Sequence, residues 1–228
     1  MNLAYIGFGK MGRAVEEAAR ERGHATGAVI DNPADWQNHA DELRRCDLAV
    51  EFSTPATAAE NIIRCLDLGI PVVSGTTGWH DRLDEVVSLC RQRQGALFVA
   101  SNFSIGMNIM FQLNRRLAEL MQGRDYNVAI SETHHVHKLD APSGTAIVLA
   151  NDIAAIAGST PPIESHRVGE VPGIHEVVYD SAVDTLTLRH EAKSRKGLAL
   201  GAVLAAEFLV GRKGFFTMYD LLNDSPSA

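Results

Sequence analysis

The segment Glu132–Thr145 has the highest density of side chains that can carry protons or bind anions. It reads E-T-H-H-V-H-K-L-D-A-P-S-G-T and places His134, His135, His137 and Lys138 within five positions. An imidazole titrates near neutral pH and can accept or donate a proton, and a lysine ammonium attracts carboxylates. The Ser-Gly-Thr at the end of the segment starts an apolar helical pattern, so its backbone N–H groups can hold a carboxylate. The segment therefore predicts a site that binds an anionic substrate and moves a proton.

The same residues could instead bind a metal ion or form a solvated loop. Three imidazoles can ligate a metal ion, but adjacent histidines in a loop lack the i, i+4 spacing of a helical zinc site, and no cysteine accompanies them. A solvated polar loop is the second alternative, because polar connections are common. Asp140 either orients a neighbouring His or Lys or caps the turn. We favour the substrate site and expect no metal.

A second motif, G-x-G-x-x-G, lies near the N-terminus between an expected strand and an expected helix. Gly7 permits a tight turn, Gly9 lets the backbone approach a pyrophosphate, and Gly12 lets helix and strand pack closely. The start of the following helix offers free N–H groups to phosphates. The predicted nucleotide-binding residues of this turn are Gly7, Phe8, Gly9, Lys10, Met11 and Gly12.

An acid at the end of the second expected strand bears on the choice of cofactor. Asp31 follows Gly12 at the distance where a carboxylate binds ribose hydroxyls. Its charge would repel a 2′-phosphate, and the next residue is Asn32 rather than an arginine. Lys10 and Arg13 offer only partial compensation. The pattern favours NADH, with NADPH as an alternative cofactor.

Two later loops also follow expected strands. Ligands of open α/β sheets bind at the carboxyl ends of the strands, so these loops are candidates to hold the nicotinamide. They are Gly75, Thr76 and Thr77, and Ala100, Ser101, Asn102 and Phe103. Their alternative role is that of ordinary strand-to-helix turns.

The first hundred residues alternate short apolar runs with helical patterns. Expected strands cover 3–6, 25–30, 48–52, 71–74 and 96–100, and expected helices cover 10–22, 53–68 and 80–93. This alternation predicts an α/β fold with a parallel sheet covered on both faces, as in a Rossmann-like dinucleotide-binding domain.

The rhythm changes after Ser101 to an α+β pattern. It comprises helices 105–121 and 145–157, a strand 127–131, antiparallel strands after Pro161-Pro162 that include a hairpin of 176–181 with 184–191, and helices 201–210 and 218–222. We expect residues 1–103 and 203–228 to form the dinucleotide-binding domain and residues 104–202 to form a second domain.

Composition limits the class of protein. The 228 residues are 46% hydrophobic with a net charge of -7 and no basic block, which argues against nucleic acid as a partner. No apolar run approaches the roughly 20 residues of a membrane span, and the first residues lack the pattern of a signal peptide. Cys46, Cys65 and Cys90 show no metal or redox spacing. We expect a cytoplasmic protein with buried thiols.

The histidine-rich block, E-T-H-H-V-H-K-L-D-A-P-S-G-T-A, is very similar to the signature of the dihydrodipicolinate reductase family, also called 4-hydroxy-tetrahydrodipicolinate reductases. Further similar segments are G-F-G-K-M-G-R at 7–13, G-T-T-G at 75–78, S-N-F-S-I-G-M-N at 101–108, R-V-G-E-V-P-G-I-H at 167–175 and G-F-F-T-M-Y-D-L-L at 214–222. The resemblance spans nearly the whole chain.

The resemblance implies an NAD(P)H-dependent reduction of a cyclic imine dicarboxylate in diaminopimelate and lysine biosynthesis. It implies that His134 and Lys138 handle the proton, that His135, Gly144 and Thr145 bind the substrate's carboxylates, and that residues 104–202 bind substrate and form a homotetramer. His137 receives no role.

One departure from the family concerns the cofactor. Many members carry an arginine after the acid of the second strand, where this chain has Asn32. The difference strengthens the expectation of NADH. Two rival functions remain: another Rossmann-type amino-acid dehydrogenase, against which the histidine-lysine block argues, and a non-enzymatic nucleotide-sensing module, which would have no need of Lys138.

Overall fold

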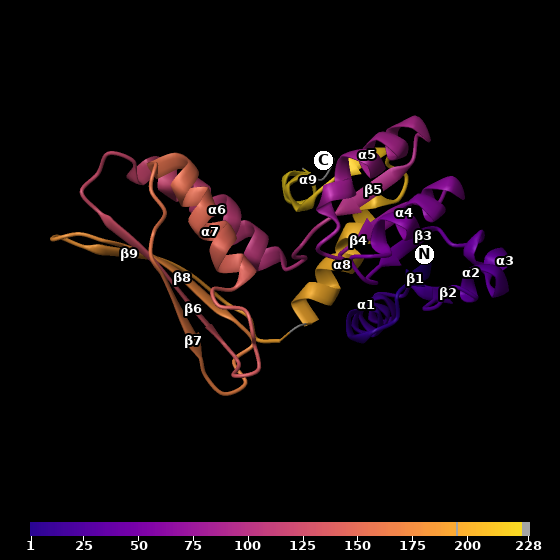
Figure 1. Ribbon diagram of the computed structural model, residues 1–228, viewed down its shortest axis with the longest axis horizontal. Coiled ribbons are helices and arrows are strands. Elements are labelled where there is room, and N and C mark those ends of the chain that lie inside the picture. Colours follow the sequence, from indigo (N-terminus) through magenta and orange to yellow (C-terminus); the bar gives the residue numbers. More distant parts are fainter. Residues whose placement is uncertain (195, 225–228) are drawn as a thin grey trace. The chain divides into compact units, whose positions relative to one another are not determined.

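The computed structural model describes residues 1–194 and 196–224. The chain divides into two compact units (Figure 1). Unit 1 comprises Met1–Ile105 and Lys196–Ala228, and unit 2 comprises Gly106–Arg195. The chain re-enters unit 1 at Lys196 rather than at residue 203, because the helix expected from Gly201 already begins at Lys196.

Unit 1 is built on a six-stranded parallel sheet with the strand order β10-β5-β4-β3-β1-β2. The strands are β1 (Asn2–Ile6), β2 (Ala25–Ile30), β3 (Leu48–Glu51), β4 (Val72–Ser74), β5 (Ala96–Val99) and β10 (Gly214–Phe216). The order reverses at β1, so the predicted Rossmann-like architecture is confirmed. The edge strand β10 was not predicted, since three residues after a helix give too short a pattern.

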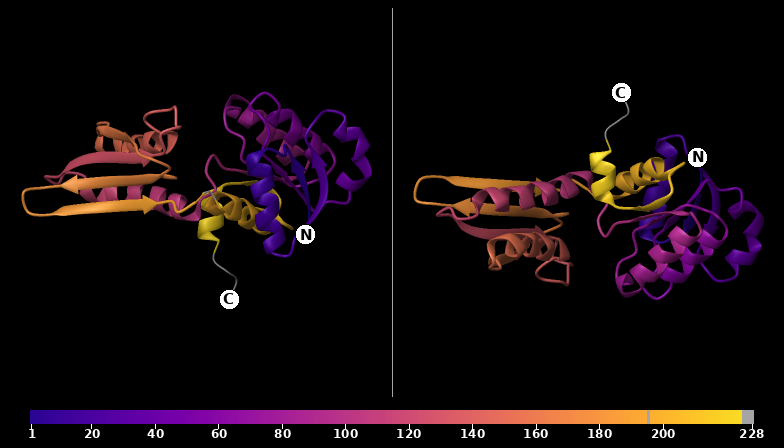
Figure 2. Two further views of the ribbon diagram at one scale, coloured as in Figure 1. Left: turned by 90° about the horizontal axis from the view of Figure 1, so that it is seen from below. Right: turned by 90° about the horizontal axis from the view of Figure 1, so that it is seen from above.

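Helices cover both faces of this sheet (Figure 2). They are α1 (Lys10–Glu21), α2 (Asp35–Asn38), α3 (Ala40–Leu43), α4 (Ala58–Asp67), the short 3-10 helix η1 (His80–Arg82), α5 (Leu83–Gln92), α8 (Lys196–Leu209) and α9 (Met218–Asn223). One apolar cluster joins α1, α8 and α9 to one face of the sheet, and a second joins α4 and α5 to the other. Two buried layers therefore fix the strand ends that carry the nucleotide motif.

Helix α4 starts five residues later than expected from Ser53. The hydroxyl of Thr57 lies 3.1 Å from that of Ser53 and 2.9 Å from that of Thr54, so these side chains bond to one another in a turn. Short hydroxyl side chains compete in this way with helix formation. The turn keeps residues 53–57 at the strand end beside the glycine-rich loop.

Unit 2 is a four-stranded mixed sheet with the order β7-β6-β8-β9. Its elements are α6 (Ile105–Met121), β6 (Asn127–His134), α7 (Gly144–Ala157), β7 (Ile163–Arg167), β8 (Ile174–Asp180) and β9 (Thr185–Glu191). The expected β8–β9 hairpin is present. Strand β7 runs parallel to β6, against the expectation of antiparallel strands, because α7 carries the chain back across the sheet before β7 begins.

Helices α6 and α7 cover one face of the unit 2 sheet, as both views of Figure 2 show. Their core contains Met107, Met110, Leu149 and Ile153, packed on sheet residues such as Val177. Strand β6 extends to His134, three residues beyond the predicted end. Successive strand residues face opposite sides, so Ile130, Glu132 and His134 all face the helices.

Within residues 1–194 and 196–224, no helix combines the length and the apolar character that a membrane crossing requires.

Candidate active site

The three glycines of the first motif differ in how closely the protein packs around them. Gly7 has φ +85°, and a Cβ there would lie 2.3 Å from the Phe52 carbonyl oxygen. A Cβ on Gly12 would lie 2.4 Å from the Gly7 carbonyl oxygen, whereas a Cβ on Gly9 would meet nothing within 4 Å. The turn is thus closely packed at its ends and open in the middle, where a phosphate would approach the start of α1.

Asp31 is tied to this turn. Its Oδ1 accepts a hydrogen bond of 2.7 Å from the Phe8 N–H. Its own N–H donates to Asp35 Oδ2 at 2.8 Å, and Asn32 donates to the same oxygen from its backbone and its side chain. The Asp31 N–H contributes most to lowering the pKa of Asp35 below its ordinary value. Two carboxylates therefore stand at the end of β2.

A cavity of about 560 Å³ in unit 1 connects these groups. Its lining includes Gly7, Gly9 and Asp31, together with Trp36 and Arg64. The Arg64 guanidinium lies 5.2 Å from the centre of the Trp36 ring. Neither Trp36 nor Arg64 was predicted from the sequence, because neither belongs to a motif and α2 was not expected. Only the fold brings them beside the glycine-rich turn.

A second cavity of about 340 Å³ brings Gly75, Thr76 and Thr77 together with Gly9, Lys10 and Met11. The loop after β4 is held by Glu51, which is completely buried at the end of β3. Glu51 accepts hydrogen bonds from Ser74 Oγ at 2.6 Å and Thr76 Oγ1 at 2.9 Å, and also from Ser53. Two strand ends are thus joined through one carboxylate.

The loop after β5 was predicted to hold the nicotinamide, but the contacts described for it lie within unit 1. Phe103 is buried, and its ring lies 5.8 Å from that of Phe52. A Cβ on Gly75 would collide with both rings, so glycine is needed there. Ala100 donates its N–H to the Ser74 carbonyl at 3.2 Å, and Asn102 accepts from the Ser104 N–H at 2.9 Å. Neither Ala100, Ser101, Asn102 nor Phe103 lines the two cavities described above.

In unit 2, the register of three strands assembles a buried charge network. Glu132 on β6 lies opposite His175 on β8 and beside Ser165 on β7, and His134 lies beside Arg167. Arg167 donates to both carboxylate oxygens of Glu132, at 3.1 and 2.9 Å, and His134 Nδ1 is bonded to Glu132 Oε2. Glu132 is fully buried, so the pairing offsets its loss of hydration.

The network sets the charge of its members. Burial of Glu132 alone would raise its pKa, but hydrogen bonds from Arg167 and His134 lower the pKa to about 2. Burial lowers the pKa of His134, and Glu132 opposes this effect only in part. Burial also lowers the pKa of His175 to about 4. At neutral pH, Glu132 is ionised and both imidazoles are neutral.

The start of α7 is attached to the same network. Ser143 is the N-cap of α7, and its Oγ accepts the Ala146 N–H at 3.2 Å. Its own N–H donates to Glu132 Oε1 at 3.2 Å, and its Oγ lies 3.1 Å from His175 Nε2. Gly144 and Thr145, the predicted carboxylate-binding residues, form the first turn of this helix. The structure therefore brings them close to His134 through Glu132.

Lys138 lies in the loop after β6. Its Nζ donates to Asp140 Oδ1 at 2.8 Å, and this bond is the main reason why the pKa of Asp140 is lowered. Arg167 also donates to the carbonyl oxygens of Lys138, at 3.3 Å, and Asp140, at 2.6 Å. The arginine that pairs with Glu132 thus also holds the loop that carries the ammonium group.

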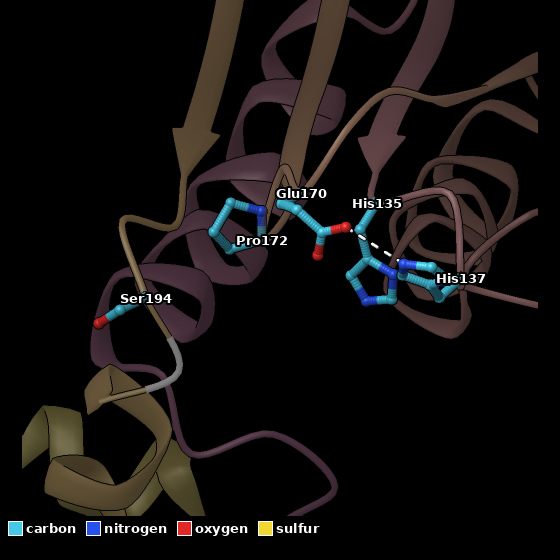
Figure 3. Close-up of a pocket in the computed structure, with 5 residues that line it drawn as sticks. All are labelled: His135, His137, Glu170, Pro172 and Ser194. Carbon is cyan, nitrogen blue, oxygen red and sulfur yellow. Dashed lines mark hydrogen bonds and ion pairs between the residues drawn. The ribbon is translucent and has the colours of Figure 1, made fainter.

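His135 faces a different surface from His134. It lines a cavity of about 350 Å³ with His137, Glu170, Pro172 and Ser194. Figure 3 shows the two imidazoles side by side, with Glu170 reaching His137; the ring centres are 6.1 Å apart and the Glu170 Oε1–His137 Nε2 distance is 3.1 Å. This pair gives His137 a structural partner, which the sequence did not indicate.

No group of three or more His, Cys, Asp or Glu side chains suited to a metal ion occurs in the described ranges 1–194 and 196–224. The buried residues around His134 were not predicted from the sequence. Two signals were present: the period-two alternation of Glu132 with His134, and the family-like segment 167–175 that begins with Arg167 and ends with His175. Neither assigned these residues a role.

Comparison with known proteins covers both units. The family described as dihydrodipicolinate reductase, N-terminus, matches residues 1–103, and dihydrodipicolinate reductase, C-terminus, matches residues 106–222. A 4-hydroxy-tetrahydrodipicolinate reductase of Christiangramia forsetii is 44% identical over 98% of both chains, and one of Akkermansia muciniphila is 34% identical over 94% of both.

Solved structures show the same fold. A dipicolinate-bound dihydrodipicolinate reductase from Paenisporosarcina sp. TG-14 superposes with a TM-score of 0.81 at 24% identity, covering 95% of this chain and 97% of that one. An amine dehydrogenase from Mycobacterium smegmatis superposes with a TM-score of 0.63 at 11% identity, covering 96% and 95%. The general architecture is thus shared with other dehydrogenases, while the relatives that are 44% and 34% identical are reductases.

Proposed function

Since this chain belongs to the dihydrodipicolinate reductase family, we propose that Lys138 and His134 handle the proton of its reaction and that the start of α7 binds a substrate carboxylate. The family resemblance seen in the sequence is confirmed. The protein is an NAD(P)H-dependent 4-hydroxy-tetrahydrodipicolinate reductase of the diaminopimelate and lysine pathway.

The reaction adds a hydride to one carbon of a conjugated imine and a proton to the neighbouring carbon. NAD(P)H supplies the hydride when bound. The glycine-rich turn fits this group, because Gly9 leaves open space where a pyrophosphate would approach and Gly7 and Gly12 admit no side chain.

Lys138 is the proton donor in this proposal. It is an ammonium group paired with Asp140, and it also offsets the charge of a dicarboxylate. His134 is neutral at pH 7 because burial lowers its pKa, so one of its ring nitrogens has a lone pair that accepts a hydrogen bond or a proton. Its accepting nitrogen is the one that does not contact Glu132.

The substrate's carboxylates are assigned to two places. Gly144 and Thr145 lie at the start of the 14-residue helix α7, where the helix dipole favours an anion. His135 is the other proposed ligand, from the cavity that it shares with His137. The observation that carries the assignment is the Glu132 carboxylate, which contacts both His134 and the Ser143 N–H.

A steady-state assay with enzymatically generated substrate tests these roles. Lys138→Met removes the donor and should lower kcat by about 10²- to 10⁴-fold, the usual contribution of a general acid. Lys213→Met is the control, because Lys213 lies in unit 1 and donates to Gln94. Equal turnover by the wild type and Lys138→Met would refute the role of Lys138.

The preferred cofactor is proposed to be NADH. Asp31 and Asp35 bring two carboxylates together after the end of β2, and the Asn32 side chain bonds to Asp35. Arg64 lines the same cavity but stacks on Trp36. The negative charge of the two carboxylates would repel the 2′-phosphate of NADPH, which supports the preference for NADH. The positive charge of Arg64 would attract that phosphate, which supports NADPH as a second, weaker cofactor.

A homotetramer in the cytoplasm completes the proposal. Among the described residues, the helices of unit 2 pack on one face of its sheet, which supports assembly through the other face. The three cysteines are buried free thiols, which suits a reducing compartment. Light scattering coupled to gel filtration tests the assembly, and a monomer would refute it.

A further inference from the structure

We propose that Glu132 is the positioning residue of this reductase: its carboxylate fixes the proton of neutral His134 on Nδ1, so that Nε2 is the reacting nitrogen, and it holds the start of α7 in place. This inference rests on the proposed role of His134. It gives a positioning role to Glu132, a buried acid that takes no direct part in the reaction.

The tautomer follows from hydrogen-bond chemistry. Glu132 Oε2 is bonded to His134 Nδ1, and an ionised carboxylate can only accept hydrogen bonds. Nδ1 must therefore donate, and the lone pair of the neutral ring lies on Nε2. That nitrogen faces the backbone of Gly173, where a Cβ would lie only 3.1 Å from it.

Arg167 keeps Glu132 in the required state. It donates two hydrogen bonds to the carboxylate, so Glu132 remains an acceptor and cannot rotate freely. The same guanidinium binds the carbonyl oxygens of Lys138 and Asp140. The Glu132–Arg167 pair therefore connects the imidazole, the loop that carries Lys138 and, through the Ser143 N–H, the carboxylate-binding helix start.

Other charged and titratable groups around His134 come from each neighbouring element. Arg167 on β7 and Lys138 in the loop after β6 are cations that oppose protonation of the ring. His175 on β8 lies with its ring centre 5.1 Å from that of His134. Glu132 is the only group among these that favours the imidazolium, so removing its charge should move the titration of His134 to lower pH.

The first test is the pH profile of Glu132→Gln, which keeps the shape and removes the charge. We expect kcat to fall by at least about tenfold, because an unfixed tautomer of a catalytic imidazole is costly, and the acidic limb of the profile to move to lower pH. Glu207→Gln is the matched control. Glu207 accepts hydrogen bonds of 2.8 Å from Arg22 and His24 in unit 1, an equivalent Arg–Glu–His group away from the site.

A double-mutant cycle with His134→Gln separates the two functions of the carboxylate. If Glu132 acts through His134, Glu132→Gln should change kcat little in the His134→Gln background. The effect on substrate KM should persist there, because it passes through Ser143 and α7. An equal loss of kcat in both backgrounds, or an unmoved acidic limb, would overturn the proposal.

A measurement on the wild-type protein tests the proposal even if Glu132→Gln does not fold. Nitrogen-15 spectra of the His134 ring, assigned by difference with His134→Gln, should show the proton on Nδ1 above the pKa of the ring; a proton on Nε2 would overturn the proposal. The role of His134 itself is tested separately. Full activity of His134→Gln would refute the proposed function, whereas an inactive His134→Gln with a fully active Glu132→Gln would refute only this inference.

Discussion

Thr76 Oγ1 donates a hydrogen bond of 2.9 Å to the buried carboxylate of Glu51, and Thr76 Oγ1 also accepts a hydrogen bond of 2.9 Å from the Ser53 N–H. The threonine thereby joins the loop after β4 to the end of β3. Both loops line the cavity beside the glycine-rich turn. The geometry of the cofactor loops thus depends on a carboxylate that is itself inaccessible.

Thr76→Val should lower the free energy of unfolding by about 1–3 kcal/mol, because it leaves a buried charged acceptor and a backbone donor without this partner. It should also weaken NADH binding. Thr26→Val is the control, since Thr26 Oγ1 makes the same kind of 2.9 Å bond to Glu16 on the surface. Urea unfolding and NADH titration measure both effects, and equal losses in the two variants would contradict the role of Glu51.

Gly9→Ala and Gly12→Ala should fail in different ways. A Cβ at Gly9 meets no protein atom within 4 Å, so this variant should unfold like the wild type but bind NADH at least about tenfold more weakly, a difference of about 1.4 kcal/mol. A Cβ at Gly12 would lie 2.4 Å from a backbone oxygen, so that variant should lose stability. Thermal unfolding and fluorescence titration distinguish the two. Unchanged NADH affinity in Gly9→Ala would argue against pyrophosphate at this turn.

Asp31→Asn should shift the cofactor preference toward NADPH. The asparagine oxygen can still accept the Phe8 N–H, so the turn is kept while one charge is lost. We expect the ratio of kcat/KM for NADH to that for NADPH to fall by about tenfold, or about 1.4 kcal/mol. Asp47→Asn is the control, because Asp47 accepts the Asn2 N–H at the amino ends of the parallel strands, whereas Asp31 follows the carboxyl end of β2. A wild-type enzyme that strongly prefers NADPH would contradict the proposed effect of Asp31.

His175 should make unit 2 less stable in mild acid. Burial lowers its pKa to about 4, against about 6.5 in an unfolded chain. The unfolded state binds more protons between these values, so the stabilising contribution is complete above pH 6.5 and is lost as pH falls toward 4. The loss amounts to about 3 kcal/mol over that window.

Urea unfolding between pH 4.5 and 7.5 measures this dependence. His175→Gln should flatten the pH dependence, whereas His166→Gln should leave it unchanged, because His166 is exposed on β7 of the same sheet. Parallel curves for the wild type and His175→Gln would show that His175 is not buried as a neutral ring.

The sequence predicted those parts of the molecule whose causes are local. The glycines at 7, 9 and 12 are separated by fixed intervals within one turn, and the close approach of Gly12 to the Gly7 carbonyl lies within that turn. The β8–β9 hairpin likewise follows from two alternating patterns joined by a short turn. Turn chemistry and periodicity act over short distances in the chain, so they can be read without the fold.

The buried acids were not predicted, because their partners lie far away in sequence. Glu132 begins the predicted site segment, but it has no evident role until the parallel β6–β7 pairing places Arg167, 35 positions later, beside it. Trp36 and Arg64 meet in the same way only when α2 and α4 pack at one strand end. Long-range pairing determined these sites, and the sequence around each residue does not show which distant residue it will meet.

The return of the chain to unit 1 has a consequence for protein synthesis. Helix α8 covers the sheet face that contains Leu3, Tyr5 and Phe98, and β10 pairs with β5 at the sheet edge. During translation, both elements emerge only after the whole of unit 2. One apolar face of the N-terminal sheet therefore stays uncovered until α8 and β10 have been synthesised. Unit 2 is continuous in sequence, so it is the first unit that can complete its fold on the ribosome.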